Sequence, residues 1–203
     1  ANKAISFDSD PDALEATLSG GAMTFIKKLT ASSSSTLSFV DGSSDVVLDS
    51  TYKEYMFIFN NIHPANNTPL KFNLSTDNGS NYNVTKTTTA FTAYHNEGDT
   101  DTLLGYQTAH DLAQSTSDQR ITIFNIKNNN DSSMSGYLHL FNPSSSTYVK
   151  HFMSVCNYEE TSQYSINDYI AGYANTTSAI DAIRFQMESG NIDAGTITLY
   201  GIN

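Results

Sequence analysis

From Met23 to the end of the chain, apolar and polar residues alternate with a period of two in one segment after another. Leu70, Phe72 and Leu74, for example, are separated by Lys71 and Asn73. Successive side chains of a β-strand point to opposite faces, whereas an amphipathic helix needs apolar residues three or four positions apart. No helical pattern longer than a few turns occurs. The alternation therefore predicts an all-β fold for residues 23–203.

Turn residues separate the alternating segments and indicate where the predicted strands begin and end. Asp77-Asn78-Gly79 has the chemistry of a tight turn, and residues 142–146 connect two segments that we expect to form a hairpin. We predict roughly ten to twelve strands, which is typical of a jelly-roll-like antiparallel β sandwich. The run 53–60 is expected to be buried on both faces. The predicted strands are 23–29, 36–40, 53–60, 70–74, 83–94, 121–126, 136–141, 148–156, 165–173, 180–187 and 196–202.

The charge balance limits the classes of partner that the protein is expected to bind. Charged residues make up 15% of the chain, and the formal net charge is −11. A surface this acidic repels phosphates, so we expect no nucleic-acid partner. No apolar run approaches the roughly 18 residues of a spanning helix, so we expect no membrane association. Ser, Thr and Asn supply most of the polarity, which suits turns and the wet faces of strands.

Residues 1–22 differ from the rest and are predicted to form an extended acidic N-terminal arm. The segment ends in Ser19-Gly20-Gly21, which favours a flexible joint. It combines carboxylates with a few apolar residues, so we interpret it as a segment that becomes ordered against a partner; the alternative is a terminus without a partner. The predicted partner contacts are Ile5, Phe7, Asp8, Asp10, Asp12, Leu14 and Leu18.

No catalytic signature is present in the sequence. The nucleophile elbow, the zinc-protease helix motif, the P-loop and the dinucleotide fingerprint are all missing. We therefore expect a non-enzymatic protein without a cofactor. The single cysteine, Cys156, lies in an apolar run and is predicted to be a small core residue rather than a nucleophile.

Two features could suggest a metal, but each is better explained without one. Glu97, Asp99 and Asp101 stand at alternate positions and could offer oxygen ligands to Ca²⁺, yet they read as a solvated loop. His139 and His151 fall on facing arms of the expected hairpin without a third ligand in sight. We predict no metal site.

The C-terminal passage 179–202 ends in Gly195-Thr196-Ile197-Thr198-Leu199-Tyr200-Gly201. This resembles the ending of a family of tailed-bacteriophage virion proteins, common in aquatic phages, that close on G-T-I-x-L-Y-G. Similar motifs occur upstream, so the resemblance spans about Gly21 to the end and leaves the arm uncovered. They lie at 21–26 with 30–34, at 49–55 with 57–65, at 75–82 and at 136–143.

The resemblance implies a structural protein of a phage particle. We expect a capsid decoration, or cement, protein that binds the outer surface of the shell formed by the major capsid protein. Aromatic residues such as Tyr164, Tyr169 and Tyr173 suggest a homotrimer. The alternative is a tail or receptor-binding protein that recognises host-surface carbohydrate. Its candidate ligand residues are Tyr82, Tyr94, Asn96, Asp99 and Asp101.

Overall fold

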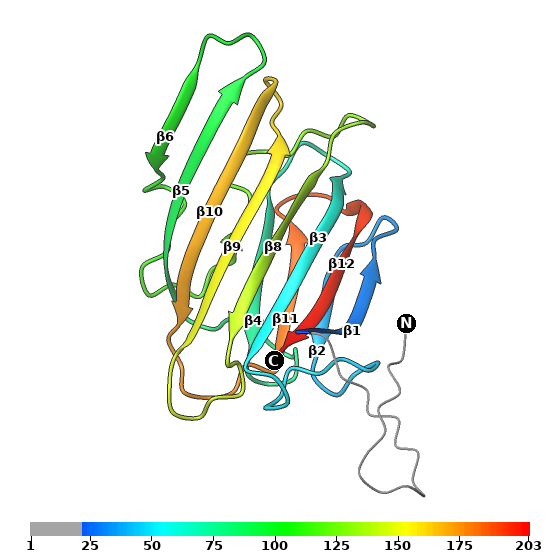
Figure 1. Ribbon diagram of the computed structural model, residues 1–203, viewed down its shortest axis with the longest axis vertical. Helices are drawn as coiled ribbons and strands as arrows, with labels where there is room; N and C mark the ends of the chain where they lie inside the picture. The colour runs from blue at the N-terminus through cyan, green and yellow to red at the C-terminus, as the bar shows by residue number, and fades with distance from the viewer. Residues whose placement is uncertain (1–21) are drawn as a thin grey trace, which may run out of the picture.

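A computed structural model describes residues 22–203 of the protein. These residues form an antiparallel β sandwich, so the predicted fold class is confirmed (Figure 1). The arm predicted for residues 1–22 lies, apart from Ala22, outside the described residues.

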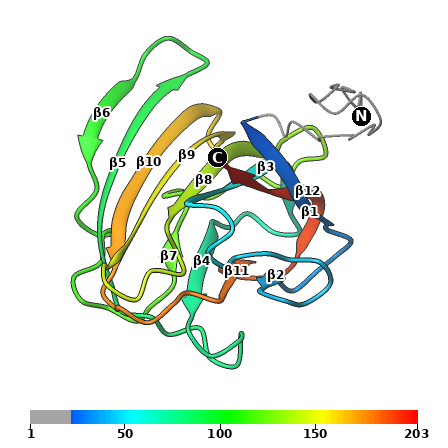
Figure 2. The ribbon, with the colours of Figure 1, turned by 60° about the horizontal axis from the view of Figure 1, so that its bottom comes forward.

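Two sheets of unequal size face each other in the sandwich (Figure 2). The larger sheet has eight strands in the order β1-β12-β3-β8-β9-β10-β5-β6, and the smaller has four in the order β2-β11-β4-β7. The strands of the larger sheet are β1 (Met23–Thr30), β12 (Ile192–Ile202), β3 (Glu54–Pro64), β8 (Met134–Phe141), β9 (Lys150–Glu159), β10 (Tyr164–Ala174), β5 (Lys86–Asn96) and β6 (Thr102–Tyr106). Those of the smaller sheet are β2 (Leu37–Val40), β11 (Ala182–Met187), β4 (Leu70–Ser75) and β7 (Gln119–Arg120).

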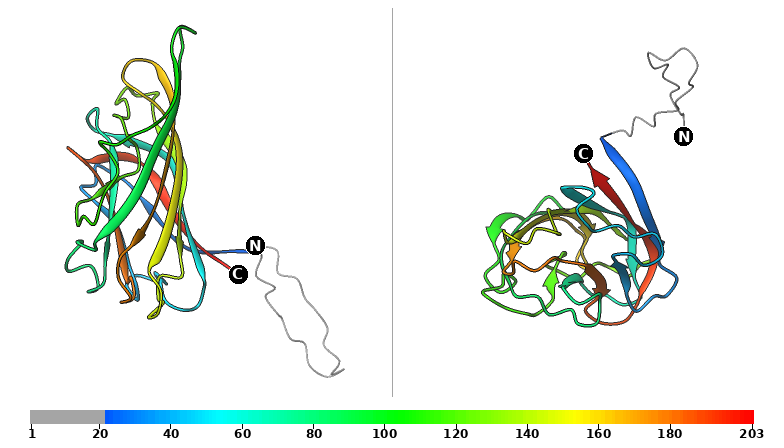
Figure 3. Two further views of the ribbon diagram at one scale, coloured as in Figure 1. Left: turned by 90° about the vertical axis from the view of Figure 1, so that its left-hand side faces the viewer. Right: turned by 90° about the horizontal axis from the view of Figure 1, so that it is seen from below.

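The β1–β12 pair marks one edge of the larger sheet. Its end, where Met23 pairs with Ile202, projects from the body on the side away from the smaller sheet (Figure 3). The opposite edge is formed by β6, which pairs with β5. The predicted hairpin is also confirmed, because β8 and β9 pair antiparallel.

The core fills the space between the two sheets and is dominated by phenylalanine. Phe185 of β11 is fully buried, and its ring centroid lies 5.5 Å from that of Phe57 and 5.3 Å from that of Phe59, both on β3. Phe39 and Phe72 surround the same ring at 6.3 and 6.5 Å. Several of these pairs meet edge to face, the arrangement that aromatic quadrupoles favour. Phe185 therefore ties the centre of the smaller sheet to the larger one.

Cys156 is buried on the inner face of β9, as predicted, with 2% of its surface exposed. Its Sγ donates a hydrogen bond to the carbonyl of Ile121 at 3.3 Å. Burial raises the pKa of the Cys156 thiol well above its ordinary value. The thiol therefore stays protonated and behaves as a small core side chain.

A carboxylate is also buried in this core. Asp168 of β10 is fully buried, and its Oδ2 accepts hydrogen bonds from the Ile123 amide at 2.6 Å and the Tyr158 hydroxyl at 2.8 Å. Burial raises the pKa of Asp168 to about 6, although both hydrogen bonds favour the charged form. Its Oδ1 and the Oγ1 of Thr92, directly opposite on β5, have no hydrogen-bond partner.

The prediction of a strand at 121–126 is wrong. Ile121, Ile123 and Ile126 are fully buried, as the alternation implied, but the segment has no regular strand partner. Two of its amides donate to side chains: the Ile123 amide donates to Asp168, and the Phe124 amide to the Tyr158 hydroxyl at 2.9 Å. The Ile121 and Ile126 amides donate to isolated backbone carbonyls, those of Leu70 and Thr68. Side-chain acceptors and isolated backbone carbonyls thus take the place of a regular strand partner, which an alternation of apolar residues cannot reveal.

Candidate functional surface

The face of the larger sheet that points away from the core is the most unusual surface of the protein. We call it the outer face. Nine large apolar side chains of the described residues are at least 39% exposed, and seven of them lie on the outer face. The other two are Leu103 and Tyr148. The outer face comprises Met23, Phe25, Lys28, Glu54, Met56, Ile58, Thr87, Thr89, Phe91, Ala93, Leu104, Tyr106, Ser135, Tyr137, His139, Phe141, His151, Met153, Val155, Asn157, Glu159, Asn167, Tyr169, Ala171, Tyr173, Thr198, Tyr200 and Ile202.

Strand register collects these side chains into rows that cross the sheet. In one row Tyr106, Phe91, Tyr169, Val155 and Tyr137 stand directly opposite one another on successive strands. The rings of Phe91 and Tyr169 are stacked, with centroids 4.7 Å apart and planes 5° from parallel. Such cross-strand contacts hold the rings in place before any partner binds.

A second row lies beside the first. Ala171, Met153, His139, Met56 and Tyr200 follow one another from β10 to β12, and Met153 is 53% exposed at its centre. The row ends on Phe25, which is 58% exposed and packs edge to face on Tyr200. Antiparallel sheets with one free face normally make that face polar, and this one does not follow the rule.

The outer face also carries almost no net charge. Its only Lys, Asp or Glu residues are Lys28, Glu54 and Glu159. The Glu159 carboxylate pairs with Lys127, and the Glu54 carboxylate is in close contact with the His139 ring. The chain as a whole has a net charge of −11, so its negative charge lies elsewhere. A contiguous apolar patch without charge is the usual mark of a protein interface.

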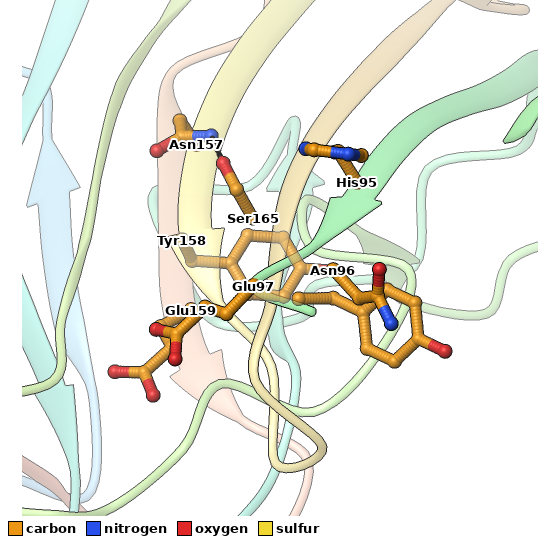
Figure 4. Close-up of a pocket in the computed structure, with 8 residues that line it drawn as sticks. His95, Asn96, Glu97, Asn157, Tyr158, Glu159 and Ser165 are labelled. Carbon is orange, nitrogen blue, oxygen red and sulfur yellow. Dashed lines mark hydrogen bonds between the residues drawn. The ribbon is translucent and has the colours of Figure 1, made fainter. Parts of the chain in front are cut away.

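A shallow pocket of about 330 Å³ adjoins the outer face where β5, β9 and β10 reach their turns (Figure 4). Glu97 and Glu159 supply carboxylates to its lining. Asn157 donates a hydrogen bond to the Ser165 hydroxyl at 3.1 Å within it. The pocket is polar and open, so it suits a hydrated ligand better than an apolar one.

Four of the five predicted ligand residues gather near this pocket. Asp101 accepts a hydrogen bond from the Tyr164 hydroxyl at 3.0 Å, and the Tyr164 ring packs on that of Tyr94 at 5.1 Å. Asn96 accepts the amides of Thr100 and Asp101 and thereby closes the β5–β6 turn. Asp99 contacts the His95 ring at 3.0 Å. Most of these polar groups are thus occupied by the turn itself.

Tyr82 does not join that group. Its ring lies under the guanidinium of Arg184, with 4.5 Å between the guanidinium carbon and the ring centroid. Arg184 belongs to β11 of the smaller sheet, so Tyr82 lies by the other sheet. The arm residues Ile5, Phe7, Asp8, Asp10, Asp12, Leu14 and Leu18 all lie outside the described residues.

Alternation alone did not predict the outer face. Met56 and Ile58 were expected to be covered as part of a strand buried on both faces, but both lie on the outer face and are only half-buried. Tyr169 and Tyr173, proposed from sequence as interface residues, do lie on it. Tyr164 points to the opposite side of β10, where it packs with Tyr94. The sequence signal that could have revealed the outer face is a strand with apolar residues at both odd and even positions, because one of the two sets must then point away from the core.

Comparisons with protein-family models, with curated proteins and with solved structures give no match. Within residues 22–203, no three His, Cys, Asp or Glu side chains are grouped so as to hold a metal ion. The same part of the chain contains no helix that is long and apolar enough to cross a membrane.

Proposed function

We propose that this protein is a non-enzymatic structural protein of a phage virion, which decorates the outer surface of the major capsid shell as a homotrimer. The resemblance of its strand and turn motifs to tailed-phage virion proteins supports the virion assignment. The observation that carries the assembly role is the outer face, a wide surface with exposed aromatic and methionine side chains and almost no net charge on an acidic molecule.

The partner that fits the outer face is a second copy of this chain. Two molecules that each carry a net charge of −11 repel one another at long range. The electrostatic cost of approach is lowest for surfaces with little net charge, and the outer face is such a surface. A basic partner would instead be expected to select an acidic surface.

The size of the outer face agrees with this role. A third row, from Thr87 on β5 to Met23 on β1, lies beside the second one. The three rows, each about 7 Å from the next, cross seven strands that are about 4.8 Å apart, which covers on the order of 600 Å². A standard protein interface buries roughly 800 Å² per partner. The outer face therefore accounts for most of an interface between subunits.

Residues 1–22 are the proposed contact with the major capsid protein. The arm offers few apolar anchors, so each arm binds modestly and several arms of one trimer bind together. Asp8, Asp10 and Asp12 would pair with Lys or Arg side chains of the shell, which makes attachment weaker at high salt.

The experiment that tests the proposed function is the copy number of the protein in purified phage particles. A decoration protein is present in hundreds of copies and dissociates from intact shells in concentrated salt. A tail protein is present in tens of copies or fewer and stays with isolated tails. Quantitative mass spectrometry of particles and of separated tails distinguishes the two, and absence from both rejects a virion role.

A charge placed on the outer face should abolish self-association. We expect Met153→Glu to convert a trimer into a monomer at micromolar concentration, because the carboxylate would have to be desolvated at the centre of the interface. Light scattering coupled to size exclusion measures the mass. Tyr148→Glu is the matched control, since Tyr148 is 70% exposed but lies on the β8–β9 loop. A monomeric wild-type protein would contradict the assignment of the outer face.

A second candidate function is the recognition of carbohydrate by a tail protein. The pocket beside Tyr164 favours it, because two tyrosines, two carboxylates and two amide side chains line it. Titration with host-surface polysaccharide tests this candidate. Tyr164→Ala should abolish binding, whereas Met153→Glu should leave it unchanged.

A further inference from the structure

The two sheets are joined by a contact between a buried lysine and a buried asparagine. Lys86 begins β5 of the larger sheet and is fully buried, and Asn73 lies on β4 of the smaller sheet with 2% exposure. The Lys86 Nζ donates a hydrogen bond to the Asn73 Oδ1 at 2.6 Å and another to the carbonyl of Val84 at 2.8 Å.

A carboxylate holds the far side of the same amide. The Asn73 Nδ2 donates to the Asp118 Oδ1 at 2.8 Å, and also to the carbonyl of Thr116 at 3.0 Å. The Asn73 Oδ1 accepts the Leu74 amide at 2.9 Å in addition to the lysine. The carboxamide is thus fixed between an amine on its oxygen side and a carboxylate on its nitrogen side.

The contact between Lys86 and Asn73 does not compensate the buried charge of the lysine. Neither hydrogen-bond acceptor of the Lys86 amine is negatively charged, whereas buried charges are normally paired. Burial lowers the pKa of Lys86 to about 8, although the charge of Asp118 acts in the opposite direction. About one amine in ten is therefore neutral at pH 7, and a neutral amine is a nucleophile.

We propose that Lys86 and Asn73 form an intramolecular isopeptide bond that joins the two sheets covalently, with Asp118 as the catalytic residue. This proposal concerns the chain itself and does not depend on the proposed virion function.

The reaction needs no oxidant or cofactor. The neutral Lys86 Nζ attacks Cγ of Asn73, and a bond forms between them. As Nζ closes on Cγ, the Asp118 carboxylate takes up the amine proton and returns it to the Asn73 Nδ2, which it already contacts. The bond between Cγ and Nδ2 then breaks, and ammonia leaves. One amine and one primary amide thus give one secondary amide and ammonia.

Asp118 is suited to the role of proton carrier. Burial opposes its ionisation, but hydrogen bonds from Asn73 and Lys71 and the positive charge of Arg184 outweigh that effect and lower its pKa. Its other oxygen is held by Lys71 at 3.0 Å and by Gln186 at 2.8 Å. The carboxylate therefore keeps its orientation toward the amide.

The product fits the site better than the reactants do. A secondary amide carries no charge, so the cost of burying the Lys86 ammonium disappears. Its N–H can still donate to the Val84 carbonyl, and its oxygen can still accept the Leu74 amide. These two hydrogen bonds thus survive the reaction, whereas the two that the Asn73 Nδ2 donates to Asp118 and Thr116 are lost with the ammonia.

Mass spectrometry of the full folded chain tests the proposal. Trypsin cleaves after Lys71, Lys86 and Arg120, so an unmodified chain gives the separate peptides 72–86 and 87–120. An isopeptide bond blocks cleavage after Lys86. We expect the single peptide 72–120, lighter than its sequence by the about 17 Da of one ammonia, without fragments from cleavage between Asn73 and Lys86.

Variants identify the reacting groups. Lys86→Arg and Asp118→Asn should reduce the ammonia loss at least about tenfold. Lys150→Arg is the matched control and should retain it, because Lys150 is equally buried but its Nζ donates to the backbone carbonyl of Thr176. Circular dichroism verifies that each variant is folded.

The wild-type digest decides the matter even if a variant does not fold. If peptide 72–86 accounts for all of this region after long incubation of the folded chain at pH 8–9, the proposal is overturned. Conversion of Asn73 to aspartate without loss of the cleavage at Lys86 would overturn it equally.

Discussion

Replacing Phe185 with alanine is expected to lower the free energy of unfolding by about 3–5 kcal/mol. Phe185 is fully buried, and its ring contacts four other phenylalanine rings that come from both sheets. These neighbours are held by their own strands, so the cavity cannot close. Urea denaturation followed by tyrosine fluorescence measures the change, since the chain contains no tryptophan.

Tyr148→Ala is the control for this measurement. Its side chain is 70% exposed, so its loss should change stability by no more than about 0.5 kcal/mol. A loss below about 1 kcal/mol for Phe185→Ala would mean that the core collapses around the missing ring. The two sheets would then be joined mainly by other contacts.

Replacing Asp168 with asparagine is expected to stabilise the protein at neutral pH. The pKa of about 6 in the folded state exceeds the ordinary value of 3.8, so the folded state holds the proton more tightly than the unfolded state. The stabilising contribution of this group is therefore fully present below about pH 4 and is lost as the pH rises to about 6. The pKa difference corresponds to about 3 kcal/mol.

Asparagine at position 168 removes that loss. Its oxygen can accept the Ile123 amide and the Tyr158 hydroxyl, and its new N–H₂ group faces Thr92, whose hydroxyl has no partner. Unfolding curves should give nearly the same free energy of unfolding for the two proteins at pH 4. At pH 7.5 the free energy of unfolding of the variant should be about 2–3 kcal/mol higher. Asp45→Asn, in an exposed loop, controls for the lost charge. An unchanged pH dependence in Asp168→Asn would disprove the burial cost.

Much of the fold could be predicted from local sequence alone. The alternation of Leu70, Phe72 and Leu74 predicted β4 because one face of that strand meets the core. The Asp77-Asn78-Gly79 turn was also recognisable, since Asn78 and Gly79 both adopt positive φ angles that these residues tolerate. Strand β6 was not predicted, because its residues are mostly exposed and their pattern carries no burial signal.

The candidate sites depend on contacts that local patterns do not encode. Met153 and Phe91 belong to one surface only because β10 lies between their strands in the sheet. Lys86, Asn73 and Asp118 come from β5, β4 and the segment before β7, and no spacing rule brings them together. A lysine at the start of a Thr-rich strand is expected to be exposed to solvent. The burial of Lys86 is therefore visible only in the three-dimensional arrangement.

The position of the last two strands has a consequence for synthesis of the chain. Strand β12 lies between β1 and β3, and β11 lies between β2 and β4. While the ribosome is still adding residues 182–202, both sheets are therefore interrupted and expose unpaired strand edges, which are prone to aggregate. The sandwich forms only after these residues have left the exit tunnel, so a chain truncated before residue 182 would leave both sheets interrupted.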